Sequence, residues 1–83
     1  MPRLVYFGRL KDAAGRGEEL FDLPPGVRTA ADLVKALAAR DEILGVALGA
    51  PSVRLAADKK IIDRDATITQ SREIAFMPPM SGG

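Results

Sequence analysis

The chain has 83 residues, with 12 Lys and Arg against 11 Asp and Glu, and it contains neither cysteine nor histidine. This length predicts one domain with one modest core, and a net charge of +1 disfavours binding to nucleic-acid phosphates. Disulfides, thiolate metal sites and the usual nucleophile–base pairs are excluded. No apolar run is long enough for a signal peptide or a membrane span, so we expect a soluble, cytoplasmic protein.

The first part of the chain predicts two strands joined by a polar connection. Residues 3–9 (RLVYFGR) are apolar and aromatic enough for a strand, and LKDAAGRG is expected to be a connection. The glycines of GRG indicate a flexible turn, because the third glycine and apolar helix of a phosphate-binding loop are missing. Residues 18–23 (EELFDL) form a candidate second strand that ends before Pro24. The two strands predict an amino-terminal hairpin.

A helix is predicted next, over residues 30–40 (AADLVKALAAR). Thr29 is placed as its N-cap, and Asp32 lies three residues on, near the positive end of the helix dipole. The apolar residues form one stripe facing the core: Ala30, Leu33, Val34, Leu37 and Ala38. DEILGVALG is expected to add a short second helical turn before Gly49 and Pro51.

The rest of the chain predicts three short strands, at residues 52–57 (SVRLAA), 59–63 (KKIID) and 72–77 (REIAFM). Asp63 and Asp65 have the spacing of two calcium ligands, but the glycine and distal glutamate of a calcium loop are missing, so we interpret them as turn residues. We predict no metal site.

The expected order is therefore β-β-α-β-β-β, and it favours an α+β, ubiquitin-like β-grasp in which a mixed sheet grips one main helix. By strand parity, the residues expected to face the helix are Leu4, Tyr6, Ile74 and Phe76. Phe7 and Met77 are then left on the open face of the sheet, which should be unusually apolar.

The chain ends in EIAFMPPMSGG, which predicts a β-grasp domain over residues 1–77 and a flexible tail over residues 78–83. Pro78 and Pro79 have no N–H to donate and favour an extended chain, so they end the last strand and project the tail outward. Gly82 and Gly83 lack a Cβ, so their backbone could thread a narrow channel. Ordinary terminal fraying is the alternative.

Together with the β-grasp order, this ending resembles the family of molybdopterin synthase small subunits, the ubiquitin-like sulfur carriers of molybdenum cofactor biosynthesis. The most specific part is Glu73 to Phe76, then Pro78 and Pro79, then Ser81 before the two glycines. The family usually has Asn-Gln at Asp58 and Lys59, and an Asp-Gly-Asp turn at residues 70–72 (QSR). These departures put the local hairpin geometry, and some partner contacts, in question.

The resemblance implies that the chain is a reagent and not an enzyme by itself. An E1-like adenylyltransferase would use ATP to adenylate Gly83, and a separate sulfur donor, whose identity stays open, would convert it to a thiocarboxylate. The carrier would bind no cofactor. Its tail would enter the large subunit of the synthase and donate sulfur to cyclic pyranopterin monophosphate, building the dithiolene. Met80 and Ser81 are expected to be contact residues.

The resemblance also raises the expectation of a docking patch formed by Phe7, Ile61 and Met77, although any of these residues could instead lie in the core. We expect no nucleic-acid or membrane partner. Three other functions remain open: a thiamine-pathway sulfur carrier, a ubiquitin-like protein modifier, and a β-grasp binding module that makes no use of its terminus.

Overall fold

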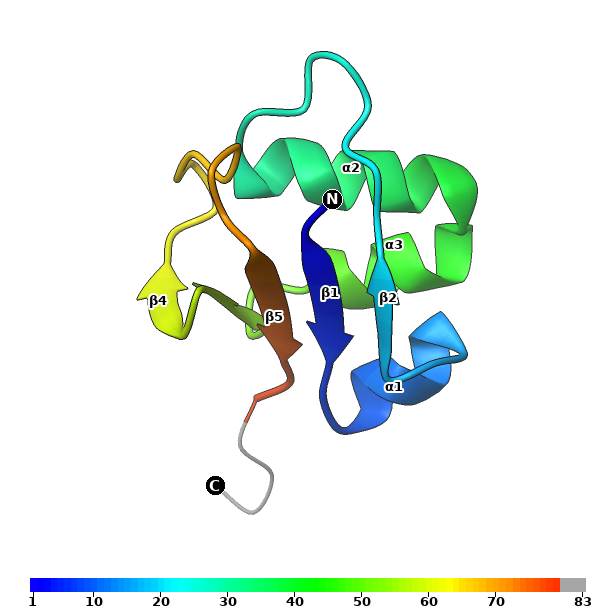
Figure 1. Cartoon of the computed structure of the whole chain (residues 1–83). Helices are drawn as coiled ribbons and strands as arrows, with labels where there is room; N and C mark the ends of the chain where they lie inside the picture. The colour runs from blue at the N-terminus through cyan, green and yellow to red at the C-terminus, as the bar shows by residue number, and fades with distance from the viewer. Residues whose placement is uncertain (80–83) are drawn as a thin grey trace.

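The structure of the chain is a computed structural model that describes residues 1–79 (Figure 1). Its elements follow in the order β1 (Arg3–Tyr6), α1 (Arg9–Ala14), β2 (Glu18–Leu20), α2 (Ala30–Arg40), α3 (Glu42–Gly49), β3 (Arg54–Ala57), β4 (Lys60–Ile62) and β5 (Glu73–Met77). None of the helices within residues 1–79 combines the length and the apolar character needed to cross a membrane.

The five strands form one mixed sheet in the order β2-β1-β5-β3-β4. The first and last strands, β1 and β5, are parallel neighbours at its centre, and the other pairs are antiparallel. Helices α2 and α3 pack behind the sheet, which leaves its other face open (Figure 1). This arrangement confirms the predicted ubiquitin-like β-grasp.

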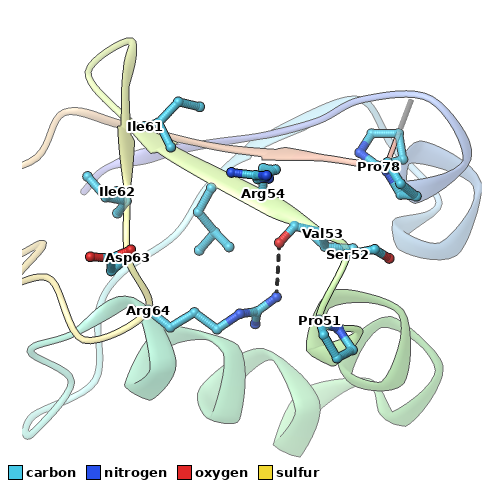
Figure 2. A pocket seen from close by; sticks show the side chains of 11 residues that line it. Pro51, Ser52, Val53, Arg54, Ile61, Ile62, Asp63, Arg64 and Pro78 are labelled. Atoms are coloured by element: carbon cyan, nitrogen blue, oxygen red, sulfur yellow. Dashed lines mark hydrogen bonds between the residues drawn. The ribbon is translucent and has the colours of Figure 1, made fainter. Parts of the chain in front are cut away.

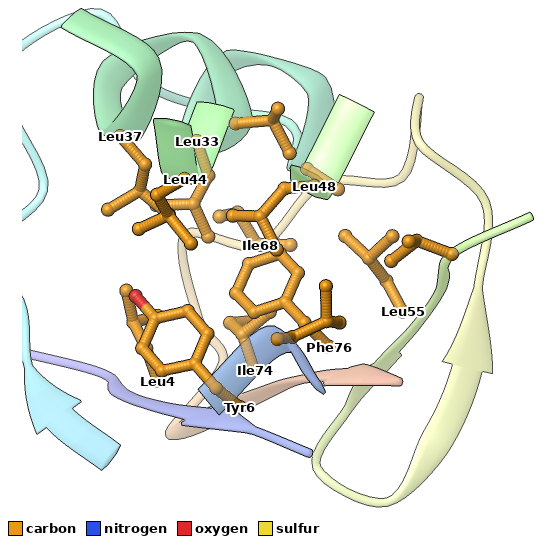
Figure 3. Close-up of a cluster of buried hydrophobic side chains, with 14 residues drawn as sticks. Leu4, Tyr6, Leu33, Leu37, Leu44, Leu48, Leu55, Ile68, Ile74 and Phe76 are labelled. Carbon is orange, nitrogen blue, oxygen red and sulfur yellow. The ribbon is translucent and has the colours of Figure 1, made fainter. Parts of the chain in front are cut away.

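The core lies between the sheet and the two helices (Figure 3). The parity prediction is confirmed, because the four sheet residues expected to face the helix are at most 1% exposed: Leu4, Tyr6, Ile74 and Phe76. The rings of Tyr6 and Phe76 stack with their centroids 5.6 Å apart. The helices contribute four fully buried leucines, namely Leu33, Leu37, Leu44 and Leu48.

Helix α2 begins as the sequence predicts. The Thr29 hydroxyl accepts a hydrogen bond from the Asp32 N–H at 3.1 Å, and the Asp32 carboxylate accepts one from the Thr29 N–H at 3.1 Å. The same carboxylate accepts from the Arg28 N–H. These backbone donors, Arg28 first, hold the pKa of Asp32 below its ordinary value because they favour the charged form. The capping box fixes the point where α2 starts.

Two predictions are wrong about helices, because one helix was predicted to be a connection and another is longer than predicted. The expected connection after β1 is the helix α1, which ends where Gly15 adopts a left-handed conformation with φ of +76° and donates to the Lys11 carbonyl at 2.9 Å. The expected helical turn at residues 41–49 is a full helix, α3, capped by the Asp41 side chain, which accepts from the Leu44 N–H at 3.2 Å. Gly45 of α3 allows the close crossing with Ala38 of α2.

The strands are present where expected but are shorter, and the turn between β3 and β4 has an uncommon conformation. Asp58 and Lys59 both have positive φ, at 50° and 73°, as a two-residue hairpin of this type requires. The Asp58 carboxylate accepts hydrogen bonds from the N–H groups of Arg72 and Glu73, each at 3.0 Å. The two departures from the family pattern therefore touch each other, and Asp58 stabilises the start of β5.

Candidate functional site

The predicted tail leaves the sheet from its central strand. β5 lies between β1 and β3, ends at Met77, and continues directly into Pro78 and Pro79, which are both partly buried. The other predicted tail residues, Met80, Ser81, Gly82 and Gly83, lie outside the described residues. The structure shows that β5 ends at Met77, and the division into a domain and a tail after this residue stays a prediction.

The turn between β1 and α1 packs against the beginning of the tail. The Phe7 N–H donates to the Phe76 carbonyl at 3.1 Å, which extends the β1–β5 ladder by one residue. Gly8 follows with φ of +55°, and a Cβ on it would lie 2.9 Å from Cγ of Pro78. The missing side chain of Gly8 therefore gives room for the proline. This contact was not predicted, because no local pattern links residues 8 and 78.

The three predicted docking residues all lie on the open side of the sheet or at its end. Phe7 is 49% exposed and Ile61 is 62% exposed, while Met77 is half-buried. Ile61 pairs with Ala56, Ala56 with Ala75, and Ala75 with Val5, so these four side chains form one row across the open face. The alanines make the centre of this row flat. Docking through these residues stays a prediction.

The open face is less apolar than expected, because charged residues alternate with the apolar ones. Arg54 lies opposite Met77 in the β3–β5 pair and is exposed. At the other end of β5, Arg3 forms an ion pair with Glu73, with Nη2 2.5 Å from Oε2. The alternation of side chains along β3 places Arg54 on the open face, but its position next to Met77 follows only from the pairing of β3 with β5.

A groove of about 520 Å³ runs beside the beginning of the tail (Figure 2). Its lining includes Ile61, Arg54, Pro78 and Pro79, so it is continuous with the predicted docking patch. At its floor the Arg64 guanidinium donates to the carbonyls of Ala50 at 3.0 Å and Val53 at 3.2 Å. Arg64 thus holds the α3–β3 loop in place, whereas the Arg54 guanidinium is exposed beside the groove.

A separate polar cluster ties β2 to the core and to α2. The Glu19 carboxylate accepts two hydrogen bonds from Arg40, at 2.7 and 2.8 Å, and one from the Tyr6 hydroxyl at 2.8 Å. The hydrogen bonds from Arg40 are the main cause of the lowered pKa of Glu19. The pKa of Tyr6 is raised, first because the hydroxyl is buried and second because it donates a hydrogen bond to the Glu19 carboxylate. The Arg40 guanidinium also lies 5.4 Å from the centre of the Phe21 ring. We interpret this cluster as a structural clamp.

The groove beside Pro78 and Pro79 has a mixed lining. Apolar side chains alternate there with polar and charged ones, namely Ser52, Arg54, Asp63 and Arg64. Within residues 1–79, no three Asp or Glu side chains are grouped closely enough to hold a metal ion, and the sequence has no cysteine or histidine. The arrangement can present an extended chain to a protein that binds the surface around it.

Comparison with family models matches residues 4–83 to the ThiS family. Comparison with curated protein sequences finds no match. Among solved structures, SAMP1 from Haloferax volcanii is 22% identical with a TM-score of 0.77, over 98% of this chain and 97% of that one. A second structure, of small archaeal modifier protein 1 from the same organism, is 19% identical with a TM-score of 0.76, over 94% and 95%.

A protein from Pyrococcus furiosus described as a molybdopterin converting factor, subunit 1, is also similar. It is 25% identical with a TM-score of 0.75, over 94% of this chain and 95% of that one. The structural likeness agrees with the β-grasp, and the family match spans the whole domain together with the final glycines. Small carriers of this kind are not catalysts alone and work with partner enzymes. The chain belongs to the ThiS family of ubiquitin-like sulfur carriers.

Proposed function

We propose that this chain is the sulfur-carrier subunit of molybdopterin synthase. The observation that carries the proposal is the ending: the central strand β5 continues into Pro78 and Pro79, and the family match extends through Gly83. The likeness to the Pyrococcus furiosus protein described as a molybdopterin converting factor supports the choice of pathway.

In this proposal the Gly83 carboxylate is the reacting group, and it must first be activated. A carboxylate oxygen attacks the α-phosphorus of ATP on an E1-like adenylyltransferase, pyrophosphate leaves, and an acyl-adenylate forms. Sulfur supplied by a donor at the oxidation level of hydrosulfide attacks the acyl carbon, and AMP leaves with the electrons of the C–O bond. The product is a thiocarboxylate. We place these steps in the cytoplasm, where ATP is supplied.

The carrier then delivers its sulfur to the large synthase subunit. The thiocarboxylate sulfur attacks an oxygen-bearing carbon of cyclic pyranopterin monophosphate, and the carbon–oxygen bond at that carbon breaks, so the oxygen leaves with the bonding electrons. Water then attacks the acyl carbon and cleaves the acyl–sulfur bond. This restores the Gly83 carboxylate and leaves the sulfur on the pterin. A second charged carrier repeats the transfer, and the two sulfurs form the dithiolene.

The described residues support this chemistry by docking the carrier. Phe7, Met77 and Ile61 would contact the partner enzymes, and Arg54 adds a charged contact beside them. Pro78 and Pro79 would direct the tail, Met80 and Ser81 would contact the walls of the channel, and Gly82 would let the backbone pass. Because the channel must accept the backbone closely, side chains at the last two positions would block it.

Intact mass spectrometry tests the carrier function. The purified protein is incubated with ATP, the E1-like partner and a sulfur donor, after its mass has established that Gly83 is the terminal residue. We expect the mass change of one oxygen-to-sulfur exchange, and none in a variant that lacks Gly83. An unmodified wild-type protein with every E1-like partner tried would contradict the proposal.

A second candidate, a ubiquitin-like protein modifier, is favoured by the likeness to small archaeal modifier protein 1. A modifier would use the same adenylate but would form an isopeptide bond to a lysine. The acceptor separates the candidates: the thiocarboxylated protein is supplied with the large subunit and cyclic pyranopterin monophosphate, or with a cell extract. Dithiolene formation supports the synthase, lysine conjugates support the modifier, and sulfur transfer to thiamine precursors alone supports the thiamine pathway.

A further inference from the structure

The sheet has two edge strands, β2 and β4, and among residues 1–79 no strand pairs with the outer side of β2. The Tyr6 N–H donates to the Gly17 carbonyl at 2.8 Å, and the Phe21 N–H donates to the Pro2 carbonyl at 3.1 Å. In an antiparallel ladder, hydrogen-bonded and non-hydrogen-bonded pairs alternate, so Gly17, Glu19 and Phe21 direct their backbone groups toward β1. The residues that alternate with them direct their N–H and C=O groups away from β1. Glu18 and Leu20 therefore direct two donors and two acceptors away from the sheet.

The side chains along this edge are apolar and acidic. Leu20 pairs with Arg3 and is 67% exposed, so its side chain is available for contact with an added strand. The Glu18 carboxylate is 62% exposed, and the nearest cation, Arg3, is 3.9 Å away. Asp22 follows two residues after Leu20 and is also exposed. The β2 edge thus presents a leucine with a carboxylate two residues to each side.

The opposite edge is built differently. In β4 the register turns only the backbone of Ile61 outward, and Lys59 and Lys60 precede it. Lysine on an edge strand is a common protection against pairing with another chain. Residues 18–23 of the β2 edge contain neither lysine nor proline. The β2 edge is therefore the one open to strand addition.

The charges on this edge determine what can pair with it. If a second copy paired antiparallel with Leu20 opposite Leu20, each Glu18 would lie opposite the Asp22 of the other copy. Like charges directly opposite each other destabilise a strand pair. A segment with basic residues opposite Glu18 and Asp22 would instead form favourable cross-strand pairs.

We propose that the β2 edge binds an extended segment of a partner protein, with an apolar side chain opposite Leu20 and a Lys or Arg two residues to each side of it. The segment adds a sixth strand to the sheet through the outward N–H and C=O groups of Glu18 and Leu20. This surface does not depend on the proposed function, because the tail continues from β5 and the groove beside it is lined by residues of β3 and β4.

A peptide titration on the full chain tests the proposal. The probe is acetyl-Thr-Lys-Thr-Val-Thr-Lys-Thr-amide, and the control peptide carries glutamate in place of both lysines. We expect the basic peptide to shift the backbone amide resonances of Glu18 and Leu20 saturably and to slow their hydrogen exchange. The acidic peptide should bind at least about tenfold more weakly.

Two edge variants locate the binding site. Leu20→Pro removes an outward N–H that makes no ladder bond, so the fold should persist while the affinity falls about tenfold. The matched variant Ile61→Pro on the β4 edge should bind the peptide as the wild type does. Glu18→Lys should reverse the preference toward the acidic peptide, and this result remains decisive if Leu20→Pro fails to fold.

Four results of the peptide experiments would overturn the proposal. They are equal binding of the two peptides, no saturable shift at Glu18 and Leu20 up to about 5 mM peptide, shifts confined to β4 or the open face, and unaltered binding by Glu18→Lys. Sedimentation of the free protein over the same concentration range tests for a second copy. If the resonance shifts in β2 accompany a rise in molecular mass, the occupant is a second copy of this chain, and that result also contradicts the proposal.

Discussion

Replacing Gly45 by alanine tests how closely α3 packs on α2. An added Cβ would lie 2.3 Å from the Ala38 Cβ and 2.6 Å from the Ala38 Cα. Carbon atoms attract at about 3.5–4.0 Å, so the two helices must separate by roughly 1 Å or more. This separation would loosen the contacts of Leu44 and Leu48, which are fully buried beneath α3.

The expected loss of stability follows from two opposing terms. Overpacking costs about 1–3 kcal/mol, and the upper end applies here because a main-chain Cα is among the clashing atoms. The better helix propensity of alanine returns about 1 kcal/mol. We therefore expect Gly45→Ala to lower the free energy of unfolding by about 2 kcal/mol, which for a domain of this size lowers Tm by roughly 8–16 °C.

Chemical and thermal denaturation measure this change, and α3 supplies the control. A Cβ on Gly49, in the same helix, would meet no heavy atom within 4 Å. Gly49→Ala should therefore leave the stability unchanged or raise it slightly. If Gly45→Ala were as stable as the wild type, or if both variants lost the same amount, the close crossing of α2 and α3 would be refuted.

Three further predictions concern docking, the tail and pH. Phe7→Asp or Met77→Asp should weaken binding to the large subunit and to the activating enzyme by about 2 kcal/mol in calorimetry, with a smaller effect on Tm; unfolding without altered binding would assign them to the core. One alanine added after Gly83, or Gly82→Val, should abolish sulfur transfer in single-turnover assays and leave Tm unchanged. The extension moves the carboxylate by about 3.3–3.6 Å, and valine adds a β-branched side chain to the tail. If the extended protein stayed untrimmed and reacted at near wild-type rates, the terminus would not be the reacting group. Glu19→Gln should lower the free energy of unfolding at pH 7 by about 1–2 kcal/mol. The pKa of Glu19 is lower in the folded than in the unfolded protein, where it is about 4.3, so the ionised carboxylate stabilises the fold above that pH, and this stabilisation is lost as pH falls through the folded pKa. A difference between variant and wild type that persists at pH 2 would contradict this sign.

Local signals predicted the parts of the fold that local chemistry determines. The pair Thr29 and Asp32 marked the start of α2, and strand parity placed Leu4 and Phe76 in the core. Helix α1 was missed because six residues are too few to show a helical period, and because Gly15, its C-cap, is also a common loop residue.

Helix α3 shows a different limit. Residues 42–49 (EILGVALG) are apolar on nearly every side, so the pattern gives no amphipathic stripe from which to measure length. Leu44 and Leu48 are buried, while Ile43 and Val46 are 73% and 74% exposed. Only the packing of α3 on α2 distinguishes these two sets.

For the candidate site, the sequence predicted the tail and three contact residues but not their setting. The tail was predicted from Pro78 and Pro79 together with the two final glycines, and its last four residues lie outside the described part of the chain. The contact of Gly8 with Pro78 joins residues 70 positions apart, and it depends on the parallel pairing of β1 and β5. A parallel pair between the first and last strands leaves no local mark in either one.

The central place of β5 also determines how the protein bears mechanical load. Over Ile74–Phe76 the strand is paired on both sides, with β1 on one edge and β3 on the other. A pull on Pro79 along the strand axis therefore loads two ladders in shear, and many hydrogen bonds must break together. An edge strand pulled in the same direction would load one ladder only, so fewer hydrogen bonds would resist the pull. A partner that holds the tail of this carrier can therefore be pulled away from it while the sheet remains paired.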